Sequence, residues 1–109
     1  MVTVTLQRPN GSLTVQVIDL CASGLAVRVA TEVARTFADD LSVDISILLP
    51  ENPTELKFVA TVQHMRREGK GIAMGLMFDK QKSPRFVVNH GHIDEYVTEQ
   101  QRVPLFETG

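Results

Sequence analysis

Hydrophobic and polar residues alternate along most of this chain, as they do in β-strands that are buried on one face only. The alternation recurs in six stretches before residue 79. We predict strands at residues 2–7, 13–20, 25–30, 41–49, 56–62 and 72–78. No long helical pattern separates them, so the sequence predicts a mainly β fold with an antiparallel sheet. Closure of that sheet into a six-stranded barrel would remove its exposed edges.

The segments between the predicted strands carry turn signals. Residues 9–12, Pro-Asn-Gly-Ser, predict a tight turn because Asn and Gly tolerate positive φ, so the first two strands should form a hairpin. Residues 66–71 predict a polar hairpin loop, and Gly75 indicates a bulge or a close approach of another backbone segment. Residues 31–40 leave two interpretations open, a short helical turn capped by Thr31 or a loop.

A helix is predicted near the end of the chain. Ser83 and Pro84 suit the N-cap and the first helical position, and the helix should run from about Pro84 to Gln100. Its apolar side follows helical spacing through Phe86, His90, Ile93 and Val97. Pro104 should lie beyond the helix, in a flexible tail. We therefore predict one domain, residues 1–109, with a core at about 2–100, a tail at 101–109, and the helix across one opening of the barrel.

Composition narrows the classes of protein. The 109 residues fit one domain, and 43% hydrophobic with 22% charged residues is an ordinary globular balance. A net charge of -2 argues against DNA or RNA binding, but a small nucleotide needs only a few local cations. The sequence has no signal-peptide pattern and no apolar run of ~20 residues, so we expect a cytoplasmic location and no membrane insertion.

The sequence carries no recognisable enzyme signature. It has neither a phosphate-binding glycine loop nor a zinc-binding HExxH pair, and His90 and His92 point in different directions on a helix. We interpret His64 as a surface residue. Cys21 has no neighbouring histidine in the sequence, and we interpret it as a small turn residue rather than a nucleophile. The prediction is a protein that is not an enzyme and holds no metal or cofactor.

The most distinctive turn is the segment Asp19–Gly24, with the sequence DLCASG, between the second and third predicted strands. We expect Gly24 there for its backbone freedom. Together with ILLP at residues 47–50 and GLMF at residues 75–78, the order of features from Val2 to Tyr96 resembles a PilZ domain. The resemblance implies a six-stranded barrel with a C-terminal helix, a bacterial source, and cyclic di-GMP as a ligand.

The resemblance also implies a ligand-binding turn. Asp19, Cys21 and Gly24 match the family's D/N-x-S-x-x-G pattern, in which the acidic residue accepts hydrogen bonds from guanine N–H groups. Cys21 replaces the serine, and a thiol is the weaker hydrogen-bonding group, so the exchange should cost ~1 kcal/mol. Auxiliary candidates for the site are Ser23, Arg8 and Arg28.

The family's second ligand-binding element, R-x-x-x-R ahead of the first strand, has no counterpart in the sequence. Two explanations stay open. The chain is a fragment whose arginine segment lies upstream, or it is a degenerate PilZ adaptor that contacts a protein partner or another domain of a parent protein without nucleotide. An unrelated OB-like or SH3-like barrel is a third interpretation. The sequence thus predicts a non-enzymatic bacterial signalling module related to cyclic di-GMP binding.

Overall fold

The computed structural model describes residues 2–8, 11–37, 41–50 and 52–108, and their side chains except those of residue 8 and residues 101–108. Six strands and two helices lie within these ranges. The strands are β1 (Thr3–Arg8), β2 (Gly11–Cys21), β3 (Gly24–Ala30), β4 (Ser42–Leu48), β5 (Leu56–Glu68) and β6 (Gly71–Phe78). The helices are α1 (Thr31–Arg35) and α2 (Phe86–Thr108).

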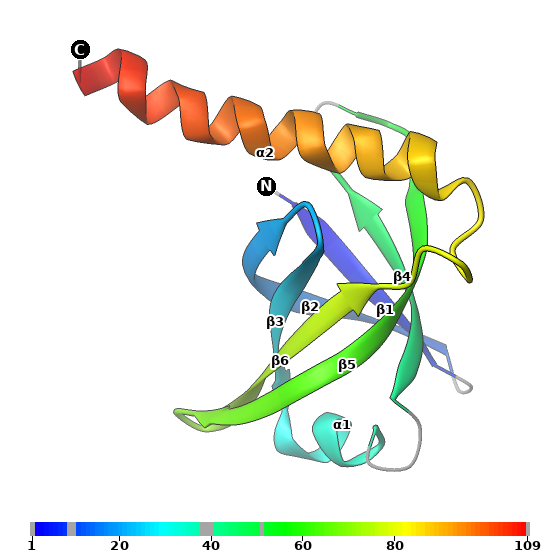
Figure 1. Cartoon of the computed structure of the whole chain (residues 1–109). Helices are drawn as coiled ribbons and strands as arrows, with labels where there is room; N and C mark the ends of the chain where they lie inside the picture. Colours follow the sequence, from blue (N-terminus) through cyan, green and yellow to red (C-terminus); the bar gives the residue numbers. More distant parts are fainter. Residues whose placement is uncertain (1, 9–10, 38–40, 51, 109) are drawn as a thin grey trace.

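The strands form a closed barrel in the order β1-β2-β3-β6-β5-β4, and β4 pairs back with β1 (Figure 1). Every pairing is antiparallel. Closure satisfies the hydrogen-bonding groups of what would otherwise be two edge strands. The predicted six-stranded antiparallel barrel with a C-terminal helix is therefore confirmed.

The alternating apolar residues fill the barrel interior. Val4, Ile45 and Leu56 are among the side chains that are almost fully buried, and the rings of Phe58 and Phe78 stack with centroids 4.2 Å apart. Helix α2 lies across one end of the barrel, and its Ile93 is completely buried (Figure 1). The helix therefore closes the core at that end.

The short helix α1 lies at the opposite end of the barrel and buries Ala34 (Figure 1). Its N-cap is Ala30 and makes no side-chain capping bond, so the predicted capping role of Thr31 is wrong. Strand β3 runs directly into the helix, and Thr31 is already its first helical residue. A side-chain bond forms at the other end instead, where Thr36 Oγ1 donates to the carbonyl of Val33 over 2.6 Å.

Both ends of α2 differ from the prediction. Ser83 does not cap the helix, because its hydroxyl bonds to the backbone N–H and carbonyl of Val59 at 2.9 and 3.2 Å. Arg85, with φ 54°, breaks the helical path after Pro84, so the helix starts at Phe86. At its other end the helix continues to Thr108 through Pro104, where we predicted a flexible tail. An internal proline removes one hydrogen bond and crowds the preceding turn, but it need not end a helix.

The hairpin between β5 and β6 is tighter than predicted. Strand pairing continues through Arg66 and Arg67 to Glu68, and Gly71 already belongs to β6. Gly69 makes the short turn with φ 61°, in the left-handed region that favours glycine. Residues 66–68 therefore belong to the sheet. The predicted β1–β2 hairpin is confirmed by its pairing, although residues 9–10 of its turn lie outside the described residues.

Candidate ligand site on the outer face of the barrel

The outward-facing residues of β2, β3, β6 and β5 line up in rows across the four strands. Cross-strand neighbours lie ~5 Å apart, and outward residues two positions apart along one strand lie ~7 Å apart. We call the first the turn row, which contains Cys21, Gly24 and Met77. The base row contains Asp19, Ala26, Gly75 and His64, and the arginine row contains Arg28, Ala73 and Arg66.

Two β-bulges turn the polar ends of the base row outward. In β2 the register shifts between Val17 and Asp19, so Asp19 pairs with Ala26 and is exposed. In β5 the register shifts between Val62 and His64, which places His64 opposite Gly75. A bulge inserts one extra residue and so reverses which side chains face the core. Asp19 and His64 therefore face solvent on the same side of the barrel.

The turn itself is closed by the thiol of Cys21. Its Sγ donates to the carbonyl of Gly24 over 3.4 Å and shares a hydrogen bond with the Ser23 hydroxyl over 3.5 Å. The Ser23 hydrogen bond is the main reason that the pKa of the Cys21 thiol lies below its ordinary value. Cys21 thus helps to fix the geometry of the turn in which it stands.

Gly24 is required by crowding rather than by backbone freedom. Its φ is not positive, unlike those of Gly11 and Gly69. A Cβ on Gly24 would lie only 2.0 Å from the carbonyl oxygen of Leu76 in β6. The predicted reason for this glycine is therefore wrong, because the approach of the β6 backbone excludes any side chain.

Gly75 makes room for the imidazole of His64. A Cβ on Gly75 would lie 2.1 Å from Cε1 of that ring and 2.6 Å from both ring nitrogens. The ring therefore lies over Gly75 on the outer face, while His64 remains exposed. Of the two alternatives predicted for Gly75, the close backbone approach is wrong, because the approaching group is the His64 ring, and the bulge lies opposite Gly75 in β5. The surface position predicted for His64 is confirmed.

A shallow pocket of about 230 Å³ brings these groups together. Its lining includes Asp19, Cys21, Ser23, Gly24, His64 and Gly75. The predicted turn residues and the auxiliary Ser23 therefore share one surface. Sequence reasoning missed that His64 lines the same pocket; the available signal was a strand glycine with a histidine on the neighbouring predicted strand.

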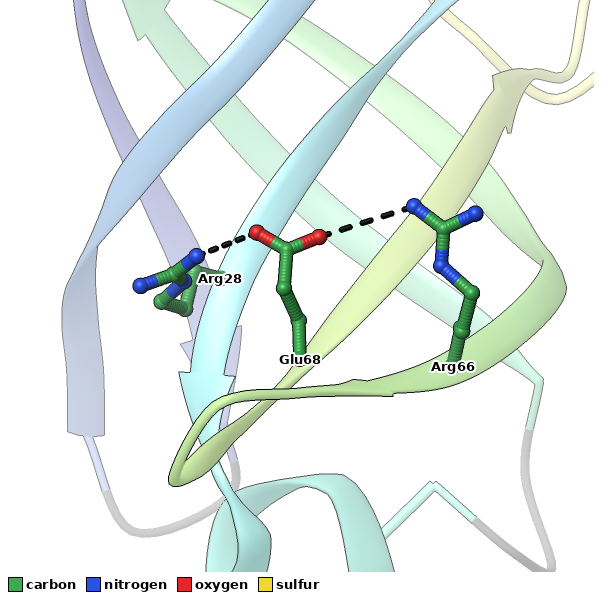
Figure 2. A network of polar contacts seen from close by, with 3 residues as sticks. All are labelled: Arg28, Arg66 and Glu68. Carbon is green, nitrogen blue, oxygen red and sulfur yellow. Dashed lines mark hydrogen bonds and ion pairs between the residues drawn. The ribbon is translucent and has the colours of Figure 1, made fainter.

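The two auxiliary arginines lie elsewhere. Arg28 is not in the pocket but in the adjacent arginine row, where its guanidinium pairs with Glu68 (Figure 2). Arg8 pairs with Gly11, at the opposite end of β2 from Cys21, so the fold does not bring it to the turn. Arg66, which the prediction assigned to a loop, also reaches Glu68, at 3.5 Å. Arg28 is the main cause that holds the pKa of the Glu68 carboxyl below its ordinary value.

Other kinds of site find little support in the described part of the chain. Three or more His, Cys, Asp or Glu side chains that could hold a metal ion do not gather anywhere among these residues. Across the same residues, no helix is both long and apolar enough to cross a membrane. Two larger hollows, of about 470 and 490 Å³, lie beside α2. Asp19 also borders the second of these hollows, together with Ile18 and Tyr96.

Comparison with known proteins agrees with this architecture. No curated protein sequence matches the chain. Among solved structures, PlzA of Borreliella burgdorferi, crystallised in complex with c-di-GMP, is similar with a TM-score of 0.62 and 9% sequence identity. The similarity covers 98% of this chain but only 46% of PlzA, so the chain spans less than half of that protein. The family model of the PilZ domain matches residues 1–99, and the chain therefore belongs to the PilZ domain family.

Proposed function

We propose that this chain is a non-enzymatic bacterial signalling module that binds cyclic di-GMP on the outer face of its barrel, with residues 1–109 acting as one domain. The observation that carries the proposal is the pocket that joins the Asp19–Gly24 turn to the exposed ring of His64. Membership of the PilZ family and the c-di-GMP complex of PlzA support the choice of ligand.

The base row offers two contacts that suit a guanine. The carboxylate of Asp19 only accepts hydrogen bonds when ionised, and the Watson–Crick edge of guanine presents N–H donors. The imidazole of His64 lies over Gly75 and offers its outer face, on which a base can stack. Ala26 is the small residue between Asp19 and the ring-covered Gly75, so no large side chain of the base row separates the carboxylate from the ring.

Cys21 fits a binding turn better than a catalytic one. Its described hydrogen bonds go to Ser23 and to the Gly24 carbonyl rather than to the imidazole of His64. A nucleophilic thiol needs a base within hydrogen-bonding reach, and this arrangement does not provide one. The thiol keeps the shape of the turn while giving a weaker ligand contact than serine would give.

The alternative function is a PilZ adaptor that acts through protein contacts without nucleotide. It is favoured by apolar side chains left exposed at the start of α2, where Val87 is 83% and Val88 49% exposed. In this alternative the contact is with a protein partner or with a domain of a parent protein. This function needs no ligand in the pocket.

Calorimetric titration with cyclic di-GMP tests the proposal. We expect saturable heat with the unaltered chain and at least tenfold weaker binding by Asp19→Ala, because a charge-assisted hydrogen bond contributes ~1.5–3 kcal/mol. Asp44→Ala is the matched control, since Asp44 is also exposed on a strand but lies on β4, outside the pocket. Absence of heat at ligand concentrations well above the micromolar range would refute direct binding and favour the adaptor.

A further inference from the structure

We propose that Arg28 and Arg66 form the phosphate-binding half of this ligand site. The inference rests on the proposed function, since it assigns the groups that would hold the phosphodiesters of a nucleotide whose base lies on the base row. Among the described residues, the lining of the pocket includes Asp19 but neither arginine nor lysine. A nucleotide carrying phosphate charge needs cations close to that pocket.

The sheet register places two guanidinium groups next to the pocket. Arg28 on β3 and Arg66 on β5 both pair with Ala73 of β6, which lies between them. This arginine row is the immediate neighbour of the base row, ~7 Å away along the strands. The bulge in β5 that turns His64 outward also turns Arg66 outward, so both residues serve the same face.

Glu68 already acts as an anion between the two guanidiniums. Figure 2 shows its carboxylate between the two side chains, with Oε1 toward Arg28 and Oε2 toward Arg66. Two oxygens of one anionic group are thus reached by two arginines from different strands. The two non-bridging oxygens of a phosphate can be held by the same pair of groups.

The charge of this cluster favours a further anion. Two positive guanidiniums against one carboxylate leave one positive charge. Each guanidinium has five N–H donors, and the side chains of Arg28 and Arg66 are 42% and 77% exposed, so donors remain accessible to a ligand. The depressed pKa of Glu68, caused mainly by Arg28, agrees with a carboxylate that stays ionised beside them.

No bulky side chain separates the arginines from the pocket. Ala73 lies between Arg28 and Arg66, and Ala26 and Gly75 are the neighbouring outward residues in the base row. These three residues contribute no group larger than a methyl, although the ring of His64 lies over Gly75 and the carboxylate of Glu68 lies between the two arginines. A ligand can cover both rows, with its base on the outer face of the His64 ring and its phosphate near the arginines.

Arg67 provides a matched control. It is exposed and carries the same charge, but it follows Arg66 directly in β5 and pairs with Ile72 rather than Ala73. Successive strand residues point to opposite faces, so Arg67 faces away from the arginine row. Its removal changes the net charge of the protein as much as removal of Arg66 does. It leaves intact the arginine clamp, by which we mean the proposed phosphate-binding pair of Arg28 and Arg66.

The first experiment compares cyclic di-GMP binding by the unaltered chain with that of Arg28→Ala, Arg66→Ala and Arg67→Ala. We expect the first two variants to bind about tenfold more weakly or worse, with a smaller dependence on salt, and Arg67→Ala to bind as the unaltered chain does. Thermal unfolding followed by circular dichroism checks that each variant is folded. Equal affinity in all four proteins would overturn the arginine clamp while leaving the proposed function standing.

The second experiment uses inorganic pyrophosphate and does not depend on the guanine contacts. The side-chain Nε–Hε signals of Arg28 and Arg66 should shift in an NMR titration, and that of Arg67 should not. If these shifts occur but cyclic di-GMP gives no heat, the clamp stands and the proposed function fails. If neither signal shifts, or if Arg67 shifts equally, the clamp is refuted whatever cyclic di-GMP does.

Discussion

The inner and outer faces of strands β3 and β6 carry very different side chains, although the same two backbones present both. The inner face packs large apolar groups into the core, namely Leu25, Val27, Val29, Met74, Leu76 and Phe78. On the outer face, the same two strands carry only hydrogen atoms or methyl groups at Gly24, Ala26, Ala73 and Gly75, and the longer Met77 and Arg28 pair with Gly24 and Ala73. The polar residues Asp19 and His64 lie on the neighbouring strands β2 and β5.

This difference separates two roles of one strand pair. Large inner side chains remove apolar surface from water and stabilise the barrel. Small outer residues add little to the core, but they allow the two backbones and the ring of His64 to come close together. Substitutions on the inner face should therefore change the free energy of unfolding. Substitutions of the polar residues that flank the small outward residues should change ligand binding.

The largest expected effect belongs to the inner face. Leu76→Ala removes a side chain that is 4% exposed and should lower the free energy of unfolding by ~2–5 kcal/mol through lost burial and a cavity. Urea unfolding measures this loss. Met77→Ala, at the neighbouring outward position that is 45% exposed, is the control and should cost much less. Equal losses in the two variants would remove the distinction between the faces.

Gly24→Ala should destabilise the protein by ~1–3 kcal/mol from the outer face, because its new methyl group would collide with the backbone of Leu76. The same unfolding measurement applies. Gly91→Ala is the matched control, since nothing lies within 4 Å of a Cβ there and alanine favours the helix. A Gly24→Ala variant as stable as the unaltered chain would show that β3 and β6 can separate at no cost.

His64→Ala should leave stability nearly unchanged, because the side chain is exposed, but should weaken cyclic di-GMP binding about fivefold or more. The reason is the loss of base stacking, which is worth ~1–3 kcal/mol per base. His64→Phe retains a ring face and should bind more tightly than His64→Ala in the same titration. Undiminished binding by His64→Ala would exclude stacking on this ring.

Much of the fold could be predicted from the sequence, because period-two alternation is a local property of each strand. The ends of the helices were harder to predict from the sequence. Serine is a residue type favoured at helix N-caps, yet the hydroxyl of Ser83 bonds to Val59, a residue far away in the sequence. Proline is a residue type that commonly ends a helix, yet α2 continues through Pro104. In both cases a local preference did not decide the outcome.

Only part of the candidate site could be predicted from the sequence. The turn at Asp19–Gly24 is contiguous, so its pattern could be found directly. His64 and Arg66 reach the same face through pairing of β5 with β6 and of β6 with β3. The reason for Gly24 also escaped the sequence, because the atom that excludes a side chain there belongs to Leu76.

The sequence by itself determined the strands, the turn and the chemical groups available for binding. The tertiary structure decided which way those groups point. In β5 the even-numbered residues up to Val62 face the core, whereas His64 and Arg66 face outward, and in β2 the bulge after Val17 turns Asp19 outward in the same way. One inserted residue reverses the alternation, and the hydrophobic pattern does not mark where that insertion occurs. The pairing of neighbouring strands therefore made a polar site from residues that simple alternation would direct into the core.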